Sequence, residues 1–145
     1  MFSGSATRSV LAERDRTSAE RDRAERVSTF LADLLSTADD PSIDETSVLR
    51  LLEPAVARAE DELAADPEAH AEVLHTLGNL YVNVAQFEKA DSLLRRTLGL
   101  YRTLHGPRSP DLAETLYDLG YLNTLTRRPD SALAAFRTSA EMLRA

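Results

Sequence analysis

The feature that most constrains the fold of this chain is a repeat of 42 residues in its second half. A shift by that length brings Gly78 onto Gly120 and Ala90 onto Ala132, with apolar residues aligned around them. A period of this size is typical of solenoid proteins, whose units stack because none can bury its apolar side chains alone. We therefore expect a short stack of similar units.

Each unit is expected to contain two helices. Its apolar side chains recur at spacings of three and four, which is the period of a helix and not of a strand. They predict helices at residues 67–84 and 87–104 in one repeat, and at 111–126 and 129–143 in the next. The predicted fold class is therefore all-α, with repeats at 67–108 and 109–145.

Residues 27–66 are interpreted as an earlier, degenerate unit. One apolar stripe lies at 30–35 and a second at 48–63, separated by the helix-breaking segment 39–42. Pro54 falls inside the second stripe, where we expect a kink or a late helix start, because proline cannot donate a backbone hydrogen bond. With this unit, the helical repeat domain spans 27–145.

Residues 1–26 are predicted to form a long charged helix that precedes the repeats. Opposite charges three residues apart, as at Glu20 and Arg23, support a helix. A helix that is polar all round is normally a solvated stalk or a bridge between domains. The segment Ala-Glu-Arg-Asp-Arg occurs twice, seven residues apart, so a coiled coil remains an alternative, although its seam would hold Asp.

Composition and spacing exclude several functions. The net charge of −7 disfavours nucleic-acid binding, and no apolar run reaches the ~18 residues of a membrane span. The chain has no cysteine, and His70 and His75 are five residues apart without a third ligand nearby, so we expect no metal and no cofactor. No nucleophile or acid pair has a catalytic context, so we expect no enzyme activity. The sequence leaves the localisation of this soluble segment unknown.

Both repeats resemble the tetratricopeptide signature W-x2-L-G-x2-Y…A-x3-F, with Leu in place of Trp. The matching residues are Leu74, Leu77, Gly78, Tyr81, Ala90 and Leu94, then Leu116, Leu119, Gly120, Asn123, Ala132 and Phe136. The resemblance implies an α-α superhelix of antiparallel helix pairs. In it, Gly78 and Gly120 allow the second helix of each pair to approach the first, and Ala90 and Ala132 leave room opposite.

The linker after the first repeat is similar to the G-P-x-H-P linker of the kinesin-light-chain-like subclass of these repeats. Residues 105–110 read His-Gly-Pro-Arg-Ser-Pro, so Ser109 stands where that subclass has His. We expect Asp111 to cap the helix that follows, since Asp is a favoured N-cap residue.

The front of the chain resembles the segment before the repeats in large bacterial serine/threonine protein kinases. The similar residues are the charged stretch 19–27 and the apolar stripe 30–35, followed by an Asp-Pro. No kinase catalytic motif is present. The resemblance implies a non-catalytic, regulatory part of such a kinase, on the cytoplasmic side or on the outer side of a bacterial membrane if the kinase is anchored there.

The tetratricopeptide resemblance also implies a binding groove for a protein or peptide. In that family the first helix of each pair lines the groove through fixed positions. With Gly78 and Gly120 as reference, these positions are Glu72, His75, Asn79, Val82, Asn83, Glu114, Tyr117, Tyr121, Thr124 and Leu125. Amides, phenols and an imidazole can hydrogen-bond a peptide backbone and stack on its side chains. The alternative is that these residues are solvated and bind nothing.

The last helix predicts a second possible function, which is oligomerisation through the stalk and the open C-terminal repeat. Its apolar residues have no further repeat in this sequence to cover them, so we expect a homodimer through this surface. The residues expected to self-associate are Leu133, Phe136, Ala140 and Leu143.

Overall fold

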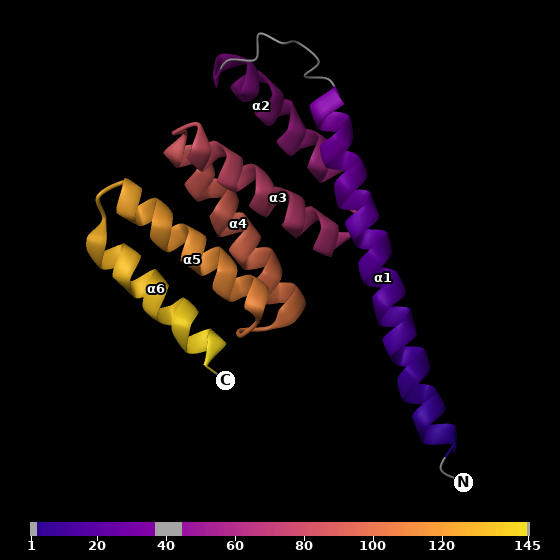
Figure 1. Cartoon of the computed structure of the whole chain (residues 1–145). Coiled ribbons are helices and arrows are strands. Elements are labelled where there is room, and N and C mark those ends of the chain that lie inside the picture. The colour runs from indigo at the N-terminus through magenta and orange to yellow at the C-terminus, as the bar shows by residue number, and fades with distance from the viewer. Residues whose placement is uncertain (1–2, 37–44, 145) are drawn as a thin grey trace.

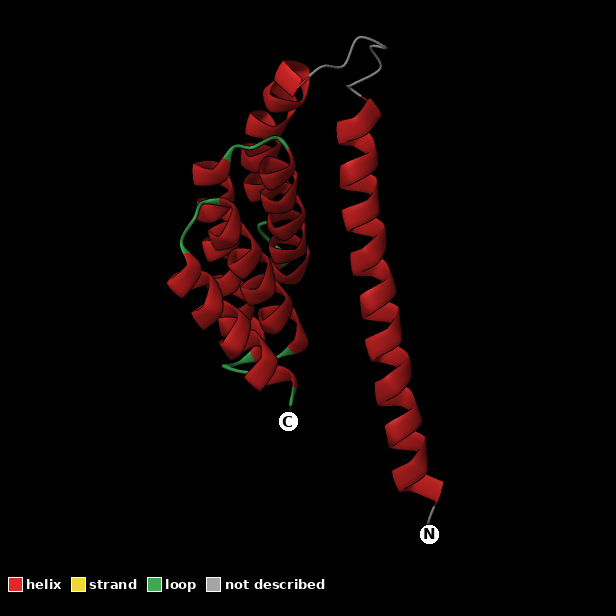
Figure 2. Ribbon diagram, turned by 60° about the vertical axis from the view of Figure 1, so that its left-hand side comes forward, coloured by secondary structure: helices red, strands yellow, loops and turns green. Residues whose placement is uncertain are grey.

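The computed structural model describes the backbone of residues 3–36 and 45–144, and the side chains of residues 18–34 and 49–144. All regular secondary structure in these ranges is helical, which confirms the predicted fold class (Figures 1 and 2). The helices are α1 (Ser3–Ser36), α2 (Glu45–Glu62), α3 (Pro67–Asn83), α4 (Phe87–His105), α5 (Pro110–Leu125) and α6 (Pro129–Leu143). None of the described helices has the length and apolar character required to cross a bilayer.

The repeat is visible in the packing of the last four helices. Helix α3 packs against α4, and α5 packs against α6, with α4 joining the two pairs (Figure 1). The turns inside the pairs also match, because Ala85 and Arg127, 42 residues apart, have left-handed φ values of 60° and 59°. The sequence repeat is therefore also a repeat of backbone conformation.

The two repeat glycines lie where the helices of each pair are closest. A Cβ atom at Gly78 would stand 3.0 Å from Cδ2 of Leu94, and one at Gly120 would stand 2.7 Å from Cε1 of Phe136. The close approach expected at these glycines is thus present. The side chains that pack against these glycines are Leu94 and Phe136. Each lies one helical turn after Ala90 or Ala132, at the last position of the tetratricopeptide signature.

Helix starts follow from capping chemistry. The expectation that Asp111 caps α5 is wrong, because Ser109 is the N-cap and its Oγ accepts a hydrogen bond from the Leu112 amide at 3.1 Å. Pro110 then fills the first turn, where a missing N–H group leaves no bond unmade. This moves Asp111 into the first turn of the helix, where its charge suits the helix dipole. Helix α2 runs through Pro54 from Glu45, so it does not start late.

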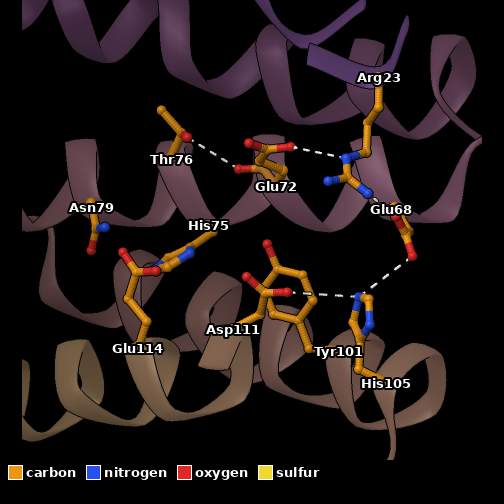
Figure 3. Close-up of a pocket in the computed structure, with 10 residues that line it drawn as sticks. All are labelled: Arg23, Glu68, Glu72, His75, Thr76, Asn79, Tyr101, His105, Asp111 and Glu114. Atoms are coloured by element: carbon orange, nitrogen blue, oxygen red, sulfur yellow. Dashed lines mark hydrogen bonds and ion pairs between the residues drawn. The ribbon is translucent and has the colours of Figure 1, made fainter. Parts of the chain in front are cut away.

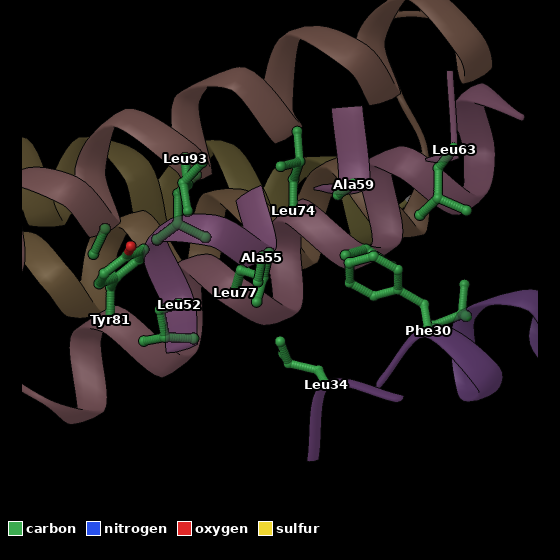
Figure 4. Close-up of a cluster of buried hydrophobic side chains, with 14 of the residues drawn as sticks. Phe30, Leu34, Leu52, Ala55, Ala59, Leu63, Leu74, Leu77, Tyr81 and Leu93 are labelled. Carbon is green, nitrogen blue, oxygen red and sulfur yellow. The ribbon is translucent and has the colours of Figure 1, made fainter. Parts of the chain in front are cut away.

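Helix α1 continues without a break across residue 26, where we expected the stalk to meet the repeat domain. The N-terminal part of this helix extends past the other helices (Figures 1 and 2), whereas Val27, Phe30 and Leu34 are buried. Figure 4 shows Phe30 and Leu34 in one cluster with residues of α2, α3 and α4. Burial of these apolar side chains holds α1 against the repeats.

Candidate interaction site

A polar cavity of about 240 Å³ lies between α1, α3, α4 and α5 (Figure 3). Helix α3 forms its longest wall, since successive turns place side chains at spacings of three and four on the same face. Tyr101 and His105, four residues apart, come from α4, and Asp111 and Glu114 come from α5. The lining residues are Arg23, Glu68, Glu72, His75, Thr76, Asn79, Tyr101, His105, Asp111 and Glu114.

A hydrogen-bonded group beside the cavity joins the two repeats. Nε2 of His75 lies 2.5 Å from Oδ2 of Asp118, and the Asn79 amide donates to the same oxygen at 3.1 Å. His75 is buried, and its ring meets the ring of Tyr101 edge-on, with centroids 6.3 Å apart. Because these contacts link α3 to α5, they fix the wall of the cavity.

Tyr101 is the most buried aromatic residue of the cavity, with 6% of its surface exposed. Its hydroxyl group is directed into the cavity and forms no hydrogen bond with any residue that the structure describes (Figure 3). Burial raises the pKa of the Tyr101 hydroxyl far above its ordinary value, and the nearby charges of Asp111, Glu72 and Glu114 raise it further. The group therefore stays protonated and neutral in physiological conditions.

Negative charge dominates the cavity. Arg23 of α1 pairs with Glu68, and its Nε lies 3.6 Å from a carboxylate oxygen of Glu72. His105 lies 3.5 Å from Glu68 and 3.7 Å from Asp111. Glu114 forms no ion pair within the described parts of the chain. Four lining carboxylates thus face one permanently charged cation, so the cavity disfavours anions.

Four of the ten residues expected in a groove line this cavity, namely Glu72, His75, Asn79 and Glu114. The other six do not. Among them Tyr117, Tyr121 and Leu125 project into solvent on α5. The ring of Tyr117 also packs on Phe136 of α6, with centroids 5.2 Å apart. The expected positions are therefore divided between the cavity and an open surface.

Sequence reasoning missed several cavity residues. Tyr101 falls in the helix expected at 87–104 and Arg23 in the expected solvated stalk, but neither was selected as a site residue. The sequence did contain a signal for Tyr101. The 42-residue shift aligns it with Leu143, so one repeat has a polar phenol where the other has a purely apolar side chain. No local signal could find Arg23, because its partners lie about 45 residues away along the chain.

Of the four residues expected to self-associate, three are exposed on α6, whereas Phe136 packs against α5. Leu133 and Leu143 are 49% and 65% exposed, Ala140 is exposed and Phe136 is half-buried. A second cavity, of about 440 Å³, opens beside them between the end of α5 and the start of α6. Its lining residues are Thr124, Arg127, Pro129, Ala132, Leu133 and Phe136.

A metal site and a nucleophile–base pair each require a particular arrangement of side chains. No group of three histidine or acidic side chains in the described residues is arranged to hold a metal ion. The His75–Asp118 pair has no serine, threonine or cysteine nucleophile among its hydrogen-bond partners. What the arrangement offers chemically is hydrogen bonding and negative charge.

Comparison with known proteins identifies the repeats. A sequence model of a family described as tetratricopeptide repeat matches residues 69–145, which is more than half of the chain. A search of curated proteins found no match.

Proposed function

The chain belongs to the tetratricopeptide repeat family, and on that basis we propose that it binds a peptide segment of a partner protein at the cavity between α3 and α5. Repeats of this family generally mediate protein–protein interactions and are not catalytic. The observation that carries the proposal is that Glu72, His75, Asn79 and Glu114, which the family pattern selects, all line a single cavity. Their polar groups can hydrogen-bond an extended peptide backbone.

The proposal can be tested by selecting peptides. A displayed library of random 12-residue peptides is panned against the chain, and the peptides recovered are measured with purified variants. Asn79→Ala and Glu114→Gln should each weaken binding several-fold, since each removes a hydrogen-bonding or charged group worth roughly 0.5–1.5 kcal/mol. Glu88→Gln is the matched control. Glu88 is also an exposed glutamate, but it lies in the first turn of α4, at the end of that helix away from the cavity residues Tyr101 and His105. Peptides that bind all four proteins equally would place the site elsewhere.

We also propose that this module is the non-catalytic, regulatory part of a bacterial serine/threonine kinase. The support is the resemblance of residues 19–35 to the segment before the repeats in such kinases. Sequencing the native gene on both sides of these residues tests this directly. A reading frame that encodes a kinase domain upstream supports the proposal, and one without a kinase domain contradicts it.

Self-association through α6 is a second candidate function, and one observation favours it. The 42-residue shift places Leu143 on Tyr101, which is buried against Leu112 of the following repeat, whereas Leu143 is 65% exposed. A second chain could cover this surface as α5 covers α4. Sedimentation should then show a dimer that Leu133→Glu and Leu143→Glu dissociate. A monomer throughout the micromolar range would rule this function out.

A further inference from the structure

We infer that the cavity between α3, α4 and α5 binds an arginine side chain of the partner segment. This inference rests on the proposed peptide-binding function and specifies the chemistry of that site. It follows from the hydroxyl of the buried Tyr101, which has no hydrogen-bond partner in the described structure, and from the negative charge around it, which includes the exposed and unpaired carboxylate of Glu114.

The Tyr101 hydroxyl is the first observation. The oxygen of this group is not sealed from solvent, because Nε2 of His70 is the one fully buried side-chain polar atom without a partner among the described residues. The hydroxyl therefore keeps its hydrogen-bonding capacity free for a ligand. Tyr101 is 94% buried, and its oxygen is directed into an open cavity rather than into the apolar core (Figure 3). A ligand donor that enters the cavity would satisfy this oxygen.

The charge of the cavity decides the class of ligand. Glu72, Asp111 and Glu114 add negative charge around the Tyr101 hydroxyl, which keeps its proton. A phosphate or carboxylate would meet repulsion here, whereas a cation would be attracted and held by ion pairs. The site therefore suits a side chain that is positively charged and carries hydrogen-bond donors.

Arginine fits these acceptors better than lysine. Its guanidinium group keeps its charge at every relevant pH and presents five N–H donors in a rigid plane, which can reach several acceptors at once. Lysine offers a compact, strongly hydrated ammonium group instead. The acceptors here lie on different walls, with Glu72 on α3, the Tyr101 oxygen on α4, and Glu114 on α5.

The chain supplies an internal precedent in Arg23. This residue of α1 reaches across to α3, where its guanidinium contacts Glu68 and Glu72 at one wall of the cavity. A guanidinium group is thus already accommodated beside the space that remains. The partner's arginine would enter next to Arg23 and share Glu72 with it.

The first test uses small probes. N-acetyl-L-arginine amide and N-acetyl-L-citrulline amide differ in charge but hardly in shape, and each is titrated into the labelled chain while backbone amide shifts are recorded. We expect the arginine probe to shift residues 72–79 and 111–114, and the citrulline probe to bind at least ten-fold more weakly. Equal responses to both probes would overturn the inference.

Variants then show whether the two unpartnered groups are used. Tyr101→Phe should weaken the arginine probe about two- to ten-fold, as expected for one hydrogen bond, without lowering the melting temperature. Glu114→Gln should weaken it at least as much, while Glu88→Gln should not. If both cavity variants bind the probe as the parent does, the cavity does not hold the guanidinium group.

The peptides selected above separate this inference from the proposed function. Both stand if the peptides share an arginine whose replacement by citrulline abolishes binding that also depends on Asn79 and Glu114. If binding depends on those residues but survives replacement of every arginine, the inference fails and the proposed function stands. If the cavity variants bind the peptides as tightly as the parent chain does, both the inference and the proposed function fail.

Discussion

The ring of Phe136 lies so close to Gly120 that a Cβ atom at residue 120 would stand 2.7 Å from Cε1 of the ring. Real Cβ atoms essentially never approach other atoms this closely, so a larger residue at position 120 would require the ring or the helix to move. The contact joins the two helices of the last repeat. Their close packing therefore depends on residue 120 being a glycine, which has no side chain.

The first prediction is that Gly120→Ala destabilises the chain. Overpacking typically costs ~1–3 kcal/mol, and this exceeds the ~0.5–1 kcal/mol that alanine gains over glycine inside a helix. Gly99→Ala is the matched control, because Gly99 is also inside a helix and a Cβ atom there would meet nothing within 4 Å. Thermal unfolding should therefore separate a lower melting temperature for Gly120→Ala from a higher one for Gly99→Ala. Stabilisation by both substitutions would contradict the close packing of α5 and α6.

The second prediction concerns the anchoring of α1. Phe30 is 4% exposed, lies in the core formed with α2 and α3, and has the guanidinium group of Arg58 5.5 Å from its ring centroid. Phe30→Ala should lower the free energy of unfolding by ~3–5 kcal/mol, as for other buried phenylalanines. Thr29→Ala, next to it on the exposed side, should change it by less than ~0.5 kcal/mol. Similar urea midpoints for the two variants would mean that α1 does not pack on the repeats.

The third prediction concerns pH. His70 of α3 has a buried Nε2 atom without a hydrogen-bond partner in the described structure. Burial lowers the pKa of His70 below 6.5, and the positive charge of Arg96 lowers it further, while Glu60 acts in the opposite direction. The unfolded chain therefore takes up this proton first as the pH falls. The stability that neutral His70 contributes is complete above pH 6.5 and is lost as the pH falls toward the lower pKa of the folded state.

Unfolding measured at pH 7.5 and at pH 5.5 checks this sign. The parent chain should lose more stability between these values than His70→Gln does, because the variant lacks the titrating group. Comparison of the two proteins cancels the contribution of the other histidines. An identical loss in both would show that His70 titrates in the folded chain as it does in the unfolded chain.

Periodicity and proline placement predicted most of the fold. The helix expected at 129–143 has those bounds, and the one expected at 67–84 ends one residue earlier. Both begin with a proline, which is favourable only in the first turn of a helix and so marks the start clearly. The cap expected for α5 was wrong because Ser109, two residues before Asp111, has a capping preference nearly equal to that of Asp, and the extended backbone at residue 109 makes Ser109 the N-cap.

The cavity was predictable only in part. The family pattern selects the face of α3 that is turned to the cavity, with Glu72, His75 and Asn79, but on α5 it selects only Glu114 among the residues that line it. It says nothing of the contacts made by α1, where a charge pattern suggested that Arg23 supports its own helix through Glu20. In the structure Arg23 reaches Glu68 and Glu72 of α3 instead. Such long-range ion pairs depend on how α1 packs, which the apolar residues 27–34 determine.

The central claim is that a partner segment binds at the cavity between α3 and α5. It is tested most directly by the backbone amide shifts of the labelled chain on addition of the tightest-binding peptide from the selection. We predict that the largest changes fall in residues 68–79, 101–105 and 111–118, which line the cavity or hold its wall. Largest changes in residues 129–143, with the cavity unaffected, would contradict the claim and favour the surface of α6.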